Sequence, residues 1–150
     1  MKFVDKELSI KVKEKGFDKP CFGYYYIETP TGLTDGELVL SRYYGRGGTF
    51  MDTLKRHDLP YTTSNIVDAP TIEQVLEWLR EDCGLYISMA CSRNYDIDAD
   101  GRELGSWVYW WYEIYAHLSA NLIYQEEEKE YDTYDEAILE GIKYVINNLI

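Results

Sequence analysis

Two histidines, His57 and His117, are the side chains best suited to proton transfer near neutral pH in this sequence. Glu113 lies four residues before His117, a spacing that makes neighbours on a helix but separates two side chains by about 13 Å along a strand. The surrounding segment favours a strand, so we expect no hydrogen-bonded pair. No serine lies in a nucleophile elbow, and no histidine and cysteine set has metal-site spacing. We therefore expect a non-enzymatic protein with no cofactor and no metal centre.

Three aspartates, Asp96, Asp98 and Asp100, precede Gly101 in the pattern that opens a calcium-binding loop. Such a loop needs a bidentate acid at its twelfth position, and counting from Asp96 this position is Trp107. A hairpin turn at Asp100 and Gly101 accounts for the same residues. The turn is the favoured interpretation, and a cation site is the alternative.

Residues 45–48 form a glycine cluster that lacks the Gly-Lys-Ser/Thr sequence of a phosphate-binding loop, which predicts a flexible hairpin loop. Lys55, Arg56 and His57 form a basic cluster nearby. This cluster is either a solvated loop or one helical turn, or it is an anion-contacting loop that orients the protein on a partner.

The three cysteines, Cys21, Cys83 and Cys91, are an odd set, and each has apolar neighbours. This pattern predicts buried free thiols in a reducing cytoplasm. The first residues of the sequence show no apolar signal-peptide region, and no apolar run approaches the roughly 18 residues of a membrane span.

The net charge of −12 is unevenly distributed. Residues 1–75 hold 10 basic and 11 acidic residues, whereas residues 76–150 hold 5 basic and 16 acidic residues. A surface of this sign repels phosphate backbones and acidic membranes, so we expect no direct nucleic-acid or membrane binding.

Residues 106–118 are unusually rich in aromatic side chains, and bulky rings with β-branched neighbours favour a strand over a helix. Alternation then sends one set of side chains to the core: Val108, Trp110, Tyr112, Ile114, Ala116 and Leu118. The opposite set faces a partly wet surface: Trp107, Tyr109, Trp111, Glu113, Tyr115 and His117. We take Trp107, Tyr109, Trp111, Tyr115 and His117 as candidate binding residues.

Two capped helices position this strand. Residues 69–84 carry an apolar stripe, the capping box Thr71 and Gln74, and the stop signal Gly84. A last helix begins at Thr133 with a second capping box to Glu136. Residues 3–15 are ambiguous between strand and helix, and their Lys and Glu content favours a short helix.

Strands are predicted for residues 21–28, 37–44, 61–68, 85–91 with an extension to 97, 106–118 and 122–131. The acidic run within 126–130 is interpreted as a solvated sheet edge. We expect a single α+β domain over residues 1–150, with antiparallel sheets and helices packed on one side. A weak internal repeat, residues 21–83 and 85–149, suggests an N-terminal helix followed by two βββα units.

Three groups of residues carry a resemblance to a known family: Lys15-Gly16-Phe17-Asp18-Lys19-Pro20-Cys21, then Ala69-Pro70-Thr71 with Trp78-Leu79-Arg80-Glu81, then Tyr131-x-Thr133-Tyr134-x-Glu136-Ala137 with Gly141-Ile142. These segments resemble small uncharacterised proteins carried by prophages and other mobile elements of gut bacteria. That family has no established activity, so the resemblance implies a bacterial cytoplasm and a phage-like context and transfers no catalytic residue.

Three functions compete. The first is an accessory protein that binds a host or phage protein through the aromatic sheet face, because Tyr and Trp, which dominate the 23 aromatic residues, are enriched in interface hot spots. The second is an acidic mimic of nucleic acid that occupies a DNA-binding host protein. The third is a small-ligand binder that uses the same aromatic face. The sequence does not predict the oligomeric state.

Overall fold

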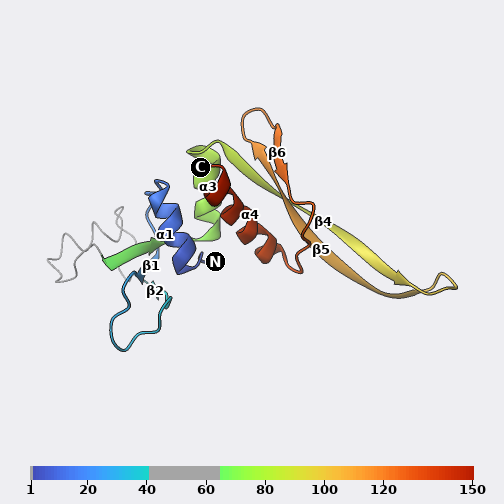
Figure 1. Ribbon diagram of the computed structural model, residues 1–150, viewed down its shortest axis with the longest axis horizontal. Coiled ribbons are helices and arrows are strands. Elements are labelled where there is room, and N and C mark those ends of the chain that lie inside the picture. The colour runs from blue at the N-terminus through green and yellow to red at the C-terminus, as the bar shows by residue number, and fades with distance from the viewer. Residues whose placement is uncertain (1, 41–64) are drawn as a thin grey trace. The chain divides into compact units, whose positions relative to one another are not determined.

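The computed structural model describes residues 2–40 and 65–150 of the chain. In chain order its elements are α1 (Lys6–Glu14), β1 (Gly23–Tyr26), β2 (Val39–Leu40), β3 (Ile66–Ala69), α3 (Ile72–Glu81), β4 (Leu85–Ile97), β5 (Glu103–Ala116), β6 (Leu122–Gln125) and α4 (Tyr134–Asn148) (Figure 1). The predicted α+β class is confirmed. The chain divides into two compact units, Met1–Trp78 and Leu79–Ile150.

Among residues 2–40 and 65–150, the order of elements matches the prediction of an N-terminal helix followed by two βββα units. Both sheets are antiparallel and three-stranded, but their strand orders differ: β2-β1-β3 in the first unit and β4-β5-β6 in the second. The central strand is therefore the first of its three in one sheet and the second in the other. The two units share an order of elements and not a topology.

Helix α1 confirms the helical interpretation of the ambiguous N-terminal segment. The Asp5 side chain caps it by accepting a hydrogen bond from the Leu8 N–H at 2.8 Å. Leu8 and Val12, one turn apart, are buried. The helix ends at Glu14, and Gly16 follows its C-cap with a φ of +99°, a left-handed conformation that favours glycine.

The first sheet packs its buried side chains Tyr25, Val67 and Ala69 into one cluster. The Tyr25 hydroxyl donates to the Val4 carbonyl at 2.8 Å, which satisfies the buried phenol. Strand β1 is shorter than predicted: it spans Gly23–Tyr26 rather than residues 21–28. Beyond it, the Asn65 side chain bonds the backbone N–H and carbonyl of Glu28 in place of a further ladder.

Helix α3 begins with the predicted capping box. The Thr71 hydroxyl accepts from the Gln74 N–H at 3.2 Å, and the Gln74 side chain accepts from the Thr71 N–H at 3.0 Å. Trp78 on this helix is buried and contacts the Phe17 ring edge-to-face, with centroids 5.7 Å apart. The sequence signature thus located the start of the helix correctly.

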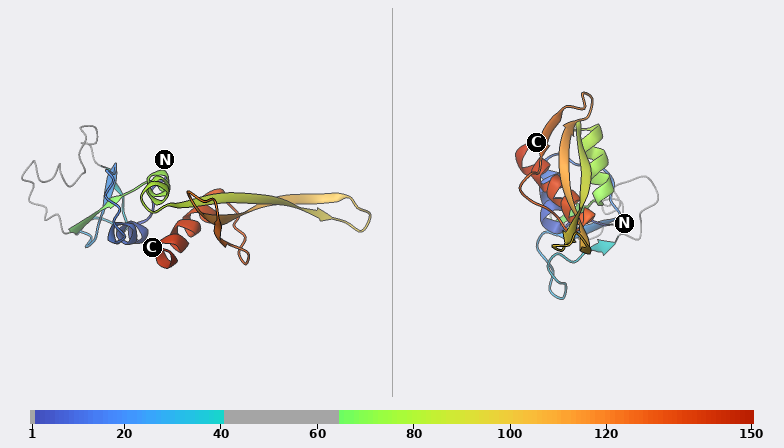
Figure 2. Two further views of the ribbon diagram at one scale, coloured as in Figure 1. Left: turned by 90° about the horizontal axis from the view of Figure 1, so that it is seen from above. Right: turned by 90° about the vertical axis from the view of Figure 1, so that its right-hand side faces the viewer.

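The second unit is built on a long hairpin of β4 and β5. The two strands pair from Leu85 with Ala116 outward to Ile97 with Glu103. Helix α4 lies along one side of the base of the hairpin, and the distal part of the two strands extends beyond it (Figures 1 and 2).

The hairpin tip forms the turn that the sequence favours at the aspartate motif. The Asp98 carboxylate accepts hydrogen bonds from the N–H groups of Asp100 and Arg102, at 2.9 and 2.8 Å. Gly101, with φ +80°, donates its N–H to the Asp98 carbonyl. The motif therefore closes the hairpin.

Helix α4 buries one face against the hairpin. Thr133 caps it by accepting from the Glu136 N–H at 3.2 Å. Its buried residues follow helical spacing: Ala137, Ile138, Gly141, Ile142, Val145 and Ile146. Gly141 allows close approach, because a Cβ there would lie 3.1 Å from both Ile87 Cγ2 and Tyr112 Cγ.

The predicted end of the last strand and the predicted burial of Leu118 are wrong. Strand β6 ends at Gln125 and not at residue 131, because the Glu126 carboxylate accepts from the N–H groups of Glu128 and Lys129 and turns the chain. Leu118, predicted in the core, is 97% exposed, since β5 ends at Ala116 and Leu118 lies in the following turn.

The three cysteines are free thiols, but only Cys21 is buried, Cys83 is half-buried and Cys91 is exposed. The prediction that all three are buried is wrong, because the side chains of β4 become exposed toward the hairpin tip and Cys91 lies in that part of the strand. The glycine cluster at 45–48, the basic cluster around His57, residues 41–44 and residues 61–64 lie outside the described residues.

Candidate binding surface on the hairpin

The pairing of β4 with β5 gives the hairpin two distinct faces. The inner face, which α4 contacts at its base, consists of Leu85, Ile87, Met89 and Cys91 from β4 and Val108, Trp110, Tyr112 and Ile114 from β5. The outer face consists of Tyr86, Ser88, Ala90, Ser92 and Asn94 from β4 and Trp107, Tyr109, Trp111, Glu113 and Tyr115 from β5. At the base of the hairpin, the β5 side chains divide between core and surface as the sequence predicted.

Burial on the inner face declines toward the tip. Ile87, Tyr112 and Ile114 are buried, whereas Val108, predicted in the core, is 37% exposed. Val108 lies on the inner face, as the alternation of the strand predicted. It is nevertheless exposed, because α4 covers only the base of the hairpin (Figure 2).

A cluster of tyrosines holds the inner face to β6 and α4. Tyr112 lies 6.0–6.3 Å, centroid to centroid, from the rings of Tyr124, Tyr131 and Tyr144. Its hydroxyl donates to the Glu126 carboxylate at 3.3 Å. Burial, together with the negative charge of Glu126, raises the pKa of Tyr112 well above its ordinary value. The tyrosines of the inner face are therefore structural.

The outer face carries the aromatic side chains that the sequence singled out for binding. Across the strands, Trp107 faces Asn94, Tyr109 faces Ser92 and Trp111 faces Ala90. Large rings on one strand thus lie beside small side chains on the other. Trp107 is 47% exposed, and Tyr109 and Trp111 are half-buried. We call Trp107, Tyr109, Trp111 and Tyr115 the aromatic stripe of β5, and Glu113 separates Trp111 from Tyr115 within it.

One hollow lies at the base of this face, beside the turn after β5. We call it the turn pocket; it has a volume of about 260 Å³ and is lined by Tyr86, Ser88, Tyr115, Ala116, His117 and Ala120. The Tyr115 hydroxyl donates to Glu113 at 2.7 Å, and this hydrogen bond raises the pKa of Tyr115. His117 is exposed, and its backbone N–H donates to the Gly84 carbonyl.

A second hollow lies farther along the stripe, between β5 and the segment that follows β6. We call it the loop pocket, and its volume is about 290 Å³. Its lining combines two aromatic side chains of the outer face with an acidic segment: Tyr109, Trp111, Gln125, Glu126, Glu127, Lys129 and Glu130. We call residues 126–130 the acidic loop. The Tyr109 and Trp111 rings lie with centroids 5.7 Å apart, tilted by 34°.

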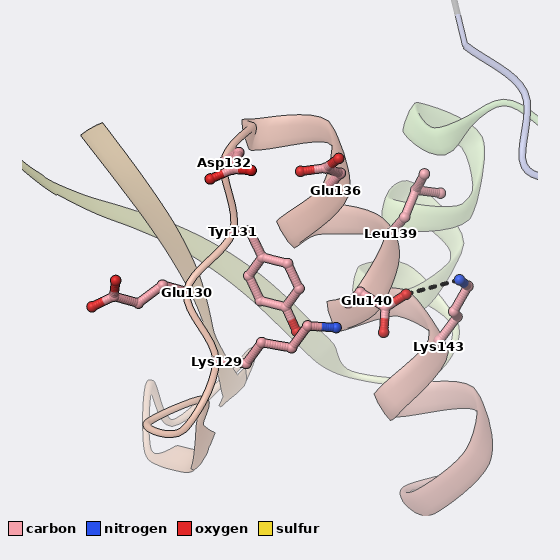
Figure 3. Close-up of a pocket in the computed structure, with 8 residues that line it drawn as sticks. All are labelled: Lys129, Glu130, Tyr131, Asp132, Glu136, Leu139, Glu140 and Lys143. Carbon is pink, nitrogen blue, oxygen red and sulfur yellow. Dashed lines mark hydrogen bonds and ion pairs between the residues drawn. The ribbon is translucent and has the colours of Figure 1, made fainter. Parts of the chain in front are cut away.

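A third hollow of about 430 Å³ lies between the acidic loop and α4, and Figure 3 shows the side chains that line it. Lys129 places its ammonium group 4.9 Å from the centre of the Tyr131 ring. Glu140 and Lys143 form an ion pair at 2.8 Å across one turn of α4. The four carboxylates here, from Glu130, Asp132, Glu136 and Glu140, give this hollow an acidic lining.

The structure brings the five predicted binding residues onto one side of the hairpin but not into one site. Tyr115 and His117 line the turn pocket, Tyr109 and Trp111 line the loop pocket, and Trp107 lies farther out on the same stripe. Sequence reasoning missed the contribution of Tyr86 from β4, although the alternation of residues 85–91 already set it opposite the core-facing positions. It also interpreted the acidic loop as a plain solvated edge, and no sequence signal placed it beside Trp111.

Within residues 2–40 and 65–150, no three side chains of histidine, cysteine, aspartate or glutamate gather where they would hold a metal ion. None of the helices described combines the length and apolar character that crossing a membrane requires. Comparisons with protein-family models, with curated proteins and with solved structures find no match. The geometry of the hairpin surface is therefore the basis on which a function can be proposed.

Proposed function

We propose that this protein works without catalysis, by binding a host or phage protein on the outer face of the β4–β5 hairpin. The phage or mobile-element context and the bacterial host come from the sequence resemblance alone. The observation that carries the proposal is the aromatic stripe of Trp107, Tyr109, Trp111 and Tyr115. Tyr109 and Trp111 pair with the small residues Ser92 and Ala90 on β4, and Tyr115 pairs with another ring, Tyr86.

This arrangement suits recognition of a protein. Tyr and Trp offer large contact area with few rotatable bonds, so that ordering them in a complex costs little entropy. Small residues such as Ala90 and Ser92 leave the sides of the rings accessible, as an interface hot spot requires. A role in the core does not account for Trp107, because nearly half of its surface is exposed, at 47%.

The test is affinity capture from a bacterial lysate with the full chain as bait, at low and at high salt, followed by mass spectrometry. The paired variant Trp107→Ala/Trp111→Ala should lose the captured protein. The control is Leu33→Ala/Leu40→Ala, which removes exposed apolar side chains from the first unit and should retain it. Circular dichroism must show that both variants fold. Retention of the captured protein by the folded tryptophan variant would contradict the proposal.

A second candidate function is an acidic mimic of nucleic acid, and the hollow beside α4 favours it. Glu130, Asp132, Glu136 and Glu140 are among the residues that line that hollow, and in Figure 3 the Glu130 side chain points away from α4. This function predicts that a basic DNA-binding protein is captured and that added salt abolishes the capture. The capture should be lost in Asp132→Asn/Glu136→Gln and retained in the tryptophan variant. Capture that persists at high salt supports the aromatic interface.

A further inference from the structure

The loop pocket combines two features that attract the same kind of chemical group. Its floor is aromatic, formed by Tyr109 and Trp111, and its wall is the acidic loop. The faces of aromatic rings carry negative electrostatic potential, and carboxylates carry negative charge. Both features favour a cation in the space between them.

The wall is held in place by hydrogen bonds at both ends. The Glu126 N–H donates to the Tyr112 carbonyl at 3.0 Å, and Tyr131 exchanges two backbone hydrogen bonds with Trp110, at 2.8 and 2.9 Å. Between these points the Glu126 carboxylate accepts from the Glu128 and Lys129 N–H groups. The loop is thus tied to the same strand that supplies the rings, so the pocket exists before any ligand binds.

The charge of the loop is unbalanced, with four glutamates and one lysine in residues 126–130. The lysine is directed to another ring, since the Lys129 ammonium lies 4.9 Å from the centre of Tyr131. Glu126 is used to brace the loop, whereas Glu127 and Glu130 line the pocket and are exposed. These two carboxylates are the ones placed to meet an incoming cation.

We propose that the loop pocket receives an arginine side chain from a basic segment of the protein partner. This inference rests on the proposed function and specifies the chemistry of the partner. A guanidinium group is planar, stacks on aromatic rings and bonds a carboxylate through two N–H groups, which an ammonium group does not. The aromatic stripe continues to Trp107 on one side, where neighbouring residues of the same segment find apolar contact.

The experiment uses the full chain labelled with ¹⁵N and two short peptides, Ac-Gly-Ser-Arg-Ser-Gly-amide and the same peptide with citrulline in place of arginine. Citrulline has nearly the shape of arginine without its charge. The readout is the indole N–H resonance of Trp111, assigned by its disappearance in Trp111→Phe. We expect a saturable shift with the arginine peptide and binding weakened roughly threefold or more with citrulline, as the loss of partly exposed charge pairs implies.

Three variants test how charge at the pocket changes the affinity for the arginine peptide. Glu127→Gln/Glu130→Gln should weaken arginine-peptide binding roughly threefold or more. Glu73→Gln/Glu77→Gln removes the same charge from exposed positions of α3 in the first unit and should leave binding unchanged. Lys129→Gln should strengthen binding, because Lys129 is one of the residues around the pocket and its positive charge, although directed to Tyr131, repels a cation there.

Equal shifts with arginine and citrulline, an absence of any shift at Trp111, or unchanged binding in the Glu127 and Glu130 variant would each overturn this inference. None of these results touches the proposed function, which fails only if the folded tryptophan variant retains its captured protein. The two failures are therefore distinguishable.

Discussion

Tyr124 of β6 and Tyr144 of α4 stack face to face, with ring centroids 3.9 Å apart and ring planes 18° apart. This contact joins the edge strand of the second sheet to the helix that covers its inner face. Tyr112 lies beside both rings. The short strand β6 is therefore held by side chains as well as by its ladder with β5.

A double-mutant cycle measures this stacking. Tyr124→Leu and Tyr144→Leu each keep apolar volume but remove a ring, and the double variant removes the pair. We expect a coupling free energy of about 0.5–1.5 kcal/mol, the value typical of aromatic pairs. The measurement is the free energy of unfolding in urea for the four proteins. A coupling indistinguishable from zero would show that the stacked geometry contributes nothing beyond burial.

Gly141→Ala should destabilise the second unit. Alanine is the better helix former by about 1 kcal/mol, but its Cβ would press on Ile87 and Tyr112 at 3.1 Å. Overpacking in a core costs about 1–3 kcal/mol, so the net effect is a loss of stability. Asn147→Ala, at an exposed position of the same helix, is the control and should be neutral or slightly stabilising. A stabilised Gly141→Ala protein would contradict the close packing of α4 on the hairpin.

Thr71→Ala should cost about 1 kcal/mol, because it removes the hydroxyl that accepts from the Gln74 N–H at the start of α3. Thr71→Ser retains the hydroxyl and should recover most of the loss. Thermal or urea unfolding measures both. If serine and alanine were equally destabilising, buried packing of the threonine methyl and not the cap would account for the effect.

Alkaline pH should weaken the second unit. Burial first, then the charges of Glu126 and Glu140, raises the pKa of Tyr131 from its ordinary 10 to about 12. The folded state therefore favours the neutral phenol. This contribution to stability is fully present below pH 10 and is lost as the pH rises from about 10 to about 12.

Absorbance of tyrosinate near 295 nm, followed together with circular dichroism, tests this expectation. Tyr131→Phe should move the alkaline unfolding midpoint upward, because it removes one phenol whose ionisation favours unfolding. Tyr95→Phe, at an exposed position near the hairpin tip, should leave the midpoint unchanged. An unchanged midpoint in Tyr131→Phe would remove Tyr131 from the alkaline transition.

The three thiols should differ in reactivity. Burial raises the pKa of Cys21 to about 12, so this thiol stays protonated and inaccessible at pH 8. Cys91 is exposed and should react first with a disulfide reagent. The release of the reagent's coloured thiol over time gives the order in which the three cysteines react. Cys91→Ser should remove the fastest phase of that release. A fast phase that survives in Cys91→Ser would contradict the exposure of β4 at this position.

The sequence predicted those parts of the fold that depend on neighbours along the chain. Thr71 with Gln74 and Thr133 with Glu136 marked the two longer helices, because a cap is a contact between residues three apart. Strict alternation over residues 106–118 assigned Tyr112 and Ile114 to the core for the same local reason. These features are set locally, whatever packs against them.

The parts that were missed depend either on a local turn without a recognisable sequence signal or on contacts distant in sequence. No sequence pattern in residues 122–131 predicts that the Glu126 carboxylate accepts hydrogen bonds from Glu128 and Lys129. These hydrogen bonds end β6 early and shape the wall of the loop pocket. The exposure of Val108 and Cys91 depends on where α4 stops along the hairpin, which is a property of the assembled unit. Tyr86 could be placed next to Tyr115 on the binding face only from the register in which β4 pairs with β5.

The outer part of the hairpin is a two-stranded ribbon, and such ribbons are only marginally stable in water without a third layer. A partner that binds only the ordered ribbon must therefore raise the melting temperature of this unit, in an amount that grows with the logarithm of its concentration. Screening a panel of candidate proteins for this thermal shift would therefore pick out the partner. Recognition and folding of the ribbon are, in this sense, a single equilibrium.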